Sequence, residues 1–470
     1  PRPPRPAGTP GGMEAASVEL VGPPVADPEY GRNVRRVFSA LFFAVSLTQV
    51  TLGPLFDAYL LNIGGERGNG NALVGFVEST RGILQLLLAY PTGMLSDRML
   101  RTRLLKRILP LWTCSLGLVL LAVISRWVPL FFVGIALWAP CSQCWNSTAQ
   151  VVVAESLPAS GRTKVVSNMT SLRLLASATG PLLQVLLLLV MGRNHWGTSL
   201  LRDVLVTGVV LWPGVILWTL RLRDLPPLEK AAGGAGRGAA SCFRPSDLDR
   251  LVFGVRLRWW VAGTMEFVSI ITAVGAGMTV KFFPLFFRVD YGFSPLAVCT
   301  LSFVYPLSIS FMVQVCRRVS KRLGRLSASV LFHFVATGCL WAMCYCRSIF
   351  LVLPLYIVRG ALMNAKGPIN RAVIMDLVTS EVRGRWNSIQ SISSFTWSGS
   401  AALGGYLADT AGDYRFTFVV TAWIYTFSGL LSLLLFLIFP KEQDALAPEL
   451  PAPSAGSVAA GGARAAGAEG

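Results

Sequence analysis

The chain has 470 residues, of which 53% are hydrophobic and only 14% are charged, and its mean hydropathy is +0.56. A soluble protein of this length would divide into several domains and carry more charge, so the composition excludes that class and indicates a membrane protein with several spans. The formal net charge of +18 does not indicate nucleic-acid binding, because the bases are concentrated in short connections between apolar runs, as the positive-inside rule produces.

The first part of the chain divides into a tail and a series of apolar runs. Residues 1–36 are rich in Pro, Gly and Ala and are predicted to be a disordered N-terminal tail. Residues 37–221 form the N-terminal half, and each of its apolar runs is long enough to cross a hydrocarbon core that needs roughly 20 residues. The spans of this half are predicted at 37–61, 71–95, 107–125, 129–153, 165–191 and 204–221.

A second half repeats this layout after one long polar connection. Residues 222–256 contain Pro226-Pro227 and a run of Gly and Ala, which predicts a flexible cytoplasmic linker. The C-terminal half covers 257–440, and residues 441–470 are predicted to be a disordered C-terminal tail. The spans of the second half are predicted near 257–287, 295–316, 326–346, 349–376, 386–408 and 416–439.

Charge patterns recur at equivalent places in the two halves. Glu155 is followed seven residues later by Arg162 after the fourth span, and Asp376 is followed seven residues later by Arg383 after the tenth. Bases gather in alternate connections, which predicts an even number of spans with both termini cytoplasmic. The sequence therefore predicts an all-α membrane protein with twelve transmembrane helices in two six-helix pseudo-repeats.

The connection between the second and third spans carries the most specific motif. It reads Gly93-Met-Leu-Ser-Asp97-Arg98-Met-Leu-Arg101 and places one acid among several bases at the membrane edge. Gly93 allows close approach of helices, and the Asp97 carboxylate can reach the N-terminus of a neighbouring helix. This order resembles the signature loop of the major facilitator superfamily, although Leu100 stands where that pattern usually has a second glycine.

A second stretch, from Arg383 to Asp409, resembles the tenth-to-eleventh helix region of a poorly characterised eukaryotic branch of that superfamily. The resemblance implies two halves that rock about a site near the membrane midplane. It also implies that Asp97 is the gating acid, which holds the second helix against the inner end of the eleventh in an outward-open state. Members often carry an arginine in the fourth helix; this chain has none there, whereas its tenth span has Arg359 beside Gly360.

Charged side chains inside the spans are the candidate substrate contacts, because charge in a bilayer is costly and usually lines a cavity or is paired. Lys281 and Arg359 lie well inside the seventh and tenth spans, which line the cavity in the fold that the resemblance implies. Asn364 and Lys366 continue one face of the tenth span from Arg359. The excess of bases in the spans favours an anionic or zwitterionic organic solute.

Two acids inside the spans are candidate proton carriers. Glu266 lies in the seventh span and Asp57 lies towards the outer end of the first, and a carboxyl group in the bilayer can take up and release a proton. The alternative for both acids is a permanent salt bridge to Lys281 or Arg359. A proton gradient or the solute's own gradient would drive transport.

The sequence predicts a secondary transporter of a small organic solute that works by alternating access. The alternative is a transporter-like receptor or scaffold that binds without transport. No phosphate loop, nucleophile motif or metal-ligand cluster is visible, so we expect no enzymatic activity, no cofactor and no metal. The expected partners are a small-molecule substrate, the lipid bilayer and protons as coupling ion, without nucleic acid. We expect a monomer, in the plasma membrane or in an organelle.

Overall fold

The computed structural model describes residues 28–66, 68–156, 159–223, 250–252, 254–378, 386 and 396–438. Helices form nearly all of the regular structure in these ranges. A short antiparallel hairpin pairs β1 (Leu251–Val252) with β2 (Val255–Arg256). Most of the predicted linker and of both predicted tails lies outside the described residues.

Two spans of the N-terminal half are interrupted by a proline, which has no backbone N–H to continue the helical ladder. The first span breaks at Gly53-Pro54, and the sixth breaks before Pro213. The helices of this half are α1 (Pro28–Leu52), α2 (Pro54–Gly65), α3 (Gly70–Arg98), α4 (Arg101–Ser125), α5 (Val128–Glu155), α6 (Ala159–Met191), α7 (Thr198–Val210) and α8 (Trp212–Leu220).

The C-terminal half has the same kind of break in its seventh and tenth spans. The seventh breaks just before Pro284, and the tenth breaks at Lys366, just before Gly367-Pro368. The tenth span, expected as one helix over 349–376, is therefore two. The helices of this half are α11 (Leu257–Val280), α12 (Phe283–Tyr291), α13 (Pro295–Leu323), α14 (Arg325–Tyr345), α15 (Ile349–Ala365), α16 (Gly367–Leu377), α18 (Ala401–Ala411) and α19 (Tyr414–Ile438).

Ten helical runs among the described residues are long and apolar enough to cross a membrane. They include α1 with α2, α7 with α8, α11 with α12, and α15 with α16, each as one span. The predicted second span, 71–95, is helical as α3 but carries Glu78 and Arg81 in its apolar stretch. The predicted eleventh span, 386–408, is described only in part. The prediction of an all-α membrane protein is confirmed.

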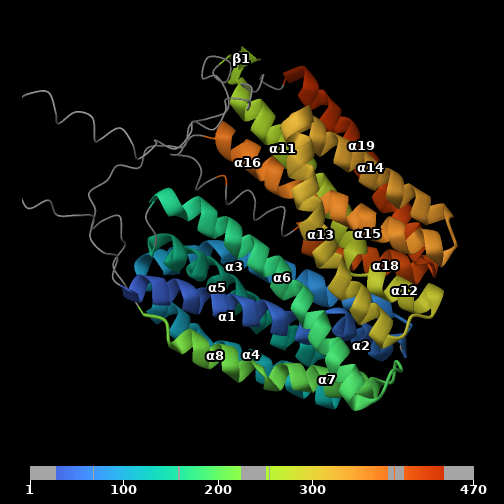
Figure 1. Cartoon of the computed structure of the whole chain (residues 1–470). Coiled ribbons are helices and arrows are strands. Elements are labelled where there is room, and N and C mark those ends of the chain that lie inside the picture. Colours follow the sequence, from blue (N-terminus) through green and yellow to red (C-terminus); the bar gives the residue numbers. More distant parts are fainter. Residues whose placement is uncertain are drawn as a thin grey trace, which may run out of the picture.

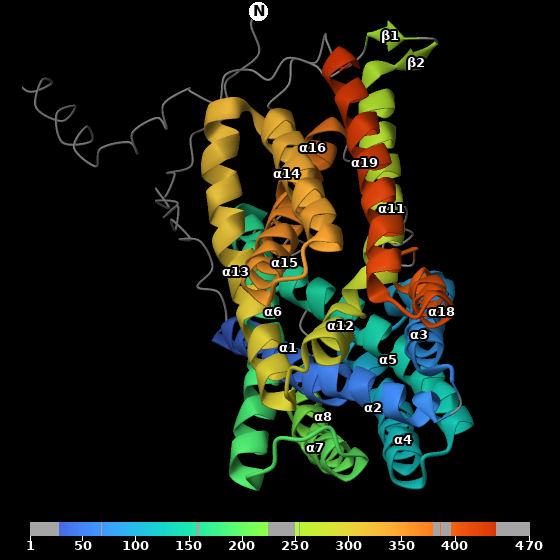
Figure 2. The same cartoon turned by 90° about the vertical axis from the view of Figure 1, so that its right-hand side faces the viewer.

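The two halves meet along two pairs of helices, α3 with α18 and α6 with α13, which lie side by side in Figure 2. In Figure 1 the halves converge at the end that carries α2 and α12, which we call the distal end. They splay apart towards the terminal end, where the Arg223 guanidinium lies 3.1 Å from the Glu29 carboxylate and where the β1–β2 hairpin lies. The contact between the halves is thus concentrated at the distal end.

Glycines allow α18 to approach both halves closely. A Cβ atom on Gly405 would lie 2.2 Å from the backbone oxygen of Asn71 in α3, and one on Gly404 would lie 2.2 Å from that of Met278 in α11. These distances are well inside van der Waals contact, so only glycine fits at either position without a shift of backbone. The smooth face on α18 holds the two halves together at the distal end.

We predict that Gly405→Ala weakens this packing, because the added methyl group must push α3 and α18 apart. Overpacking of this kind costs about 1–3 kcal/mol, so the unfolding temperature of the protein in detergent should fall. Gly338→Ala is the matched control, since a Cβ atom on Gly338 in α14 meets nothing within 4 Å. Equal unfolding temperatures for the two variants would contradict the close approach.

Candidate functional site

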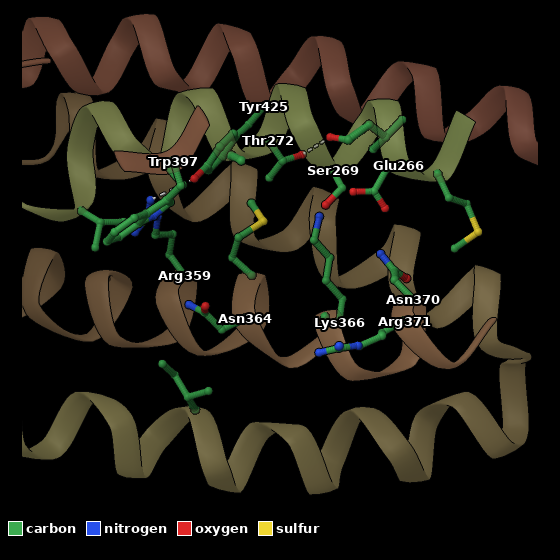
Figure 3. A pocket seen from close by; sticks show the side chains of 18 of the residues that line it. Glu266, Ser269, Thr272, Arg359, Asn364, Lys366, Asn370, Arg371, Trp397 and Tyr425 are labelled. Carbon is green, nitrogen blue, oxygen red and sulfur yellow. Dashed lines mark hydrogen bonds between the residues drawn. The ribbon is translucent and has the colours of Figure 1, made fainter. Parts of the chain in front are cut away.

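A cavity of about 370 Å³ lies within the C-terminal half, and Figure 3 shows the side chains around it. Helices α11, α13, α15, α16 and α19 form its wall, together with Trp397. A second cavity of about 280 Å³ lies between the halves, and Tyr305, Ile309 and Trp397 line both. Because they share wall residues, the two cavities adjoin, and a solute can contact both halves.

Arg359 on α15 places a guanidinium group in the wall of the larger cavity, although the residue is only 1% exposed. Its Nη2 donates to the Tyr425 hydroxyl at 3.4 Å, and its Cζ lies 4.6 Å from the centre of the Phe283 ring. Its Nε has no hydrogen-bond partner, and no carboxylate lies within ion-pair distance, in the part of the chain described. A buried charge in this setting is costly until an anion compensates it.

Aromatic side chains surround the Arg359 guanidinium. Tyr305 and Tyr425 line the cavity with Trp397, and Tyr305 stacks on Tyr356 at a centroid distance of 5.1 Å. Gly360 leaves room for this arrangement, because a Cβ atom there would lie 2.2 Å from the Tyr305 ring. The part of the wall around Arg359 therefore combines a guanidinium group with several π faces, which suits an anion that has an apolar or aromatic body.

Lys366 stands at the break between α15 and α16, so its position depends on the interrupted helix. It is 8% exposed, and its Nζ forms a hydrogen bond with Nδ1 of His333 on α14. Figure 3 shows the Lys366 ammonium and the Glu266 carboxylate of α11 directed into the same part of the cavity. Two of the predicted site residues are thus brought together, and His333 joins them.

The two asparagines of the tenth span have smaller roles. The side chain of Asn364, which was expected to contact substrate, donates to the Gly360 carbonyl at 2.8 Å while it lines the cavity. Asn370 accepts a hydrogen bond of 2.6 Å from Ser329 in α14. Both side chains therefore help to hold the wall around the break at Lys366.

Lys281 does not face the larger cavity and instead forms ion pairs across the two halves. Its Nζ lies 3.3 Å from Asp57 Oδ2 on α2 and 3.5 Å from Glu78 Oε2 on α3. It also donates to the Leu52 carbonyl at 3.4 Å. Arg81 completes the cluster with a contact of 2.5 Å to Glu78. The two acids of the N-terminal half are thus balanced by two bases, one from the same half and one, Lys281, from the C-terminal half.

Asp57, expected towards the outer end of the first span, lies on α2 near the distal end. The residue is 5% exposed and lies beside the smaller cavity. Its salt bridge to Lys281 is the alternative that the sequence left open for this acid.

Further polar contacts close the distal end. The Asp409 carboxylate accepts hydrogen bonds from the backbone N–H groups of Asn71 and Ala72 at 3.1 and 2.7 Å, and so it caps the N-terminus of α3 from the opposite half. Arg288 donates to Asn62 Oδ1 at 2.5 Å, also across the halves. Sequence reasoning gave Asp409 no role, although an acid four residues after Gly405 was the available signal.

The gating motif remains a prediction. The side chains of Gly93, Asp97 and Arg98 lie outside the described residues, and only their helix α3 is described. Arg101 begins α4 after a two-residue connection, as Arg98 ends α3. The second helix and the third are therefore joined by the short loop that the motif requires.

His333 is the main residue that sequence reasoning missed. It is 1% exposed, and its Nε2 lies 2.8 Å from the Tyr425 carbonyl oxygen and 3.2 Å from the Ser428 hydroxyl of α19. The sequence showed only a histidine inside an apolar run without metal-ligand neighbours. Its proximity to Lys366 depends on how α14 packs against α15 and α16.

Comparison with known proteins identifies a family and a fold. The family model described as Major Facilitator Superfamily matches residues 37–402 and 267–465. A search of curated proteins finds no match.

Several solved structures are similar over most of their length. A D-xylose–proton symporter has a TM-score of 0.64 at 13% identity, covering 88% of this chain and 98% of its own. A bacterial homologue of the human lysosomal transporter Spinster, inward-facing and unoccupied, has a TM-score of 0.63 at 15% identity, and the match covers 88% of this chain and 98% of the homologue. The human organic anion transporter MFSD10 has a TM-score of 0.55 at 16% identity, and the match covers 87% of this chain and 100% of MFSD10. At these identities the similarity shows the fold alone.

We predict that Lys281→Met destabilises the protein strongly, because Asp57 and Glu78 are then left with Arg81 as their nearby base. Removal of one partner from a buried pair costs about 3–5 kcal/mol, and the unfolding midpoint in detergent measures the loss. The double variant Asp57→Asn/Lys281→Met should recover much of it.

Arg32→Met is the control for this prediction, since the Arg32 side chain is 49% exposed in its pair with Glu29. An exposed pair of this kind contributes at most about 1 kcal/mol. Simple additivity of the Asp57 and Lys281 effects would contradict the assigned contact.

Proposed function

The chain belongs to the major facilitator superfamily, a family of multi-pass membrane transporters of small solutes, and we propose that it carries an organic monocarboxylate by alternating access. The proposal rests on the site rather than on any one relative, because 16% identity to an organic anion transporter supports a shared fold only.

The observation that carries the proposal is the buried Arg359 guanidinium in the cavity wall. Its Nε is without a hydrogen-bond partner among the described residues, and its neighbours are aromatic rings. A carboxylate supplies the missing charge and can accept two parallel hydrogen bonds from a guanidinium group. Lys366 is a second cation in the same wall, at the break of the tenth span.

The size and lining of the cavity favour a small solute with an apolar body. A volume of about 370 Å³ lies in the range of small-molecule sites. Tyr305, Trp397 and Tyr425 offer ring faces beside the guanidinium. An aromatic or branched aliphatic carboxylate would occupy both the charged and the apolar parts of this wall.

The proposed mechanism uses the distal contacts as the gate. The positive-inside rule places the terminal end in the cytoplasm, because bases such as Arg317, Arg318, Lys321 and Arg322 gather near the end of α13 there. The closed distal end then faces away from the cytoplasm, and the arrangement is inward-facing. We assign Asp57 and Lys281 to this gate. Opening the gate separates these two residues, because they belong to different halves, while Arg81 moves together with Asp57 in the N-terminal half.

Glu266, which the sequence proposed as a proton carrier, acts in this scheme as a compensating acid, and its role in proton coupling stays a prediction. It is 4% exposed and lines the cavity opposite Lys366. In the empty site it lowers the excess positive charge that Arg359 and Lys366 bring. An anion that enters the site takes over part of this compensation.

The test is uptake into proteoliposomes from a pooled metabolite extract, with the lumen assayed by mass spectrometry. We predict accumulation of organic anions and at least about a 10-fold loss of uptake in Arg359→Gln, since hydrogen bonds to charged groups contribute about 1.5–3 kcal/mol. Arg173→Gln is the control, because Arg173 lies in the N-terminal half and donates to Asn146 at 3.2 Å.

Three results would speak against the proposal. Accumulation of cations or neutral sugars in place of organic anions would exclude an anionic substrate. An equal loss of uptake in Arg359→Gln and Arg173→Gln would exclude a specific role of Arg359. A folded protein that binds an anion without moving it into the lumen would favour a receptor over a transporter.

A further inference from the structure

Lys366, a buried lysine in the wall of the cavity, shares a hydrogen bond with the buried His333 of α14, and the ordinary transport scheme does not account for it. His333 is 1% exposed and Lys366 is 8% exposed. Two basic groups in contact inside an apolar bundle are unfavourable if both carry a charge. The contact therefore constrains how many protons the pair can hold.

The neighbours of His333 determine which of its nitrogens carries hydrogen. The Tyr425 carbonyl oxygen, 2.8 Å from Nε2, can only accept, so Nε2 carries the N–H. The Ser428 hydroxyl also lies near this nitrogen, at 3.2 Å from Nε2. Nδ1 is then the acceptor, and the Lys366 ammonium donates to it. The pair in this state is a neutral imidazole and a charged lysine.

A second proton cannot enter while this hydrogen bond exists. A proton on Nδ1 would point at the Lys366 ammonium, and the two positive charges would repel at hydrogen-bond distance. Protonation of His333 therefore requires Lys366 to leave. Lys366 can do so, because it has a long flexible side chain at a helix break and it lines the cavity.

The charged and titratable groups around the pair make this movement depend on the content of the cavity. On α11 the group is Glu266, on α15 Arg359, on α16 Arg371, and on α19 Tyr425, which all line the same cavity. Tyr305 of α13 lies in the same wall. An anion that binds near Arg359 adds negative charge on the side to which Lys366 must turn.

We propose that His333 is the proton-binding site of this transporter and that Lys366 couples it to the anion by leaving His333 Nδ1 for the substrate carboxylate. This inference rests on the proposed anion transport. The proton comes from water in the cavity, forms an N–H bond at Nδ1, and returns to water on the other side when the anion leaves and Lys366 reoccupies Nδ1. By linkage, the proton and the anion each strengthen the binding of the other.

The direct test observes the ring of His333 by ¹⁵N NMR in lipid nanodiscs. The chain has two histidines, so His195→Gln leaves His333 as the single signal. At pH about 6 we expect the neutral form with hydrogen on Nε2. Millimolar benzoate, the simplest aromatic monocarboxylate, should convert most of it to imidazolium.

Two variants in the same background separate coupling from a general effect. Lys366→Met should leave the ring in the same state with and without benzoate, because the group that couples the two sites is gone. Lys321→Met, near the end of α13 and exposed, should behave as the parent does. Imidazolium in the parent before benzoate, or a neutral ring with and without it, overturns the inference.

A transport variant tests the same step independently. His333→Gln keeps one donor for the Tyr425 carbonyl and one acceptor for Lys366 but cannot bind a proton. It should still exchange anions, while accumulation driven by a proton gradient falls to the outside concentration. Accumulation that survives in His333→Gln but is lost in Glu266→Gln would assign the proton to Glu266 and overturn the inference.

The two proposals fail in different ways. Accumulation of an organic anion together with a permanently neutral His333 would leave the transport function intact and remove only the role of His333. Absence of any anion in the lumen removes the function on which the inference rests.

Discussion

The constraint that organises this molecule is that charge buried in an apolar bundle must be compensated by a nearby opposite charge. The N-terminal half brings two buried acids and one base, Asp57, Glu78 and Arg81, and the C-terminal half supplies the missing base, Lys281. Neither half is balanced in this cluster alone. The distal end therefore closes by an exchange of charge between halves, and the close packing of α3 with α18 adds to it.

The cavity of the C-terminal half has the opposite character, because its bases outnumber its acid. Arg359, Lys366 and Arg371 line it with Glu266. In our proposal the missing partner here is a solute rather than another helix, and this difference separates the proposed gate from the proposed binding site. Lys366 places its charge beside His333, and the inference has this charge turn towards the cavity when an anion binds. A lysine at a helix break can make this turn without movement of the whole bundle.

The fold was largely predictable, because hydropathy and loop charge report directly on burial in lipid. The pairing of charges was not. Lys281 and Asp57 are 224 residues apart in the sequence, and their contact depends on how two halves dock. The break at Lys366 was also missed, since Gly367-Pro368 is compatible with a kinked but continuous helix. His333 looked like a lone polar residue because its partners lie on two distant segments of the chain, α19 and the break at Lys366.

We propose that a monocarboxylate crosses together with one proton, so the transport cycle moves no net charge across the membrane. The most direct measurement is anion uptake into proteoliposomes with an imposed membrane potential, with and without a proton gradient. We expect the proton gradient to drive accumulation and the potential alone to have no effect. Accumulation that follows the potential, or a steady transport current, would contradict the account.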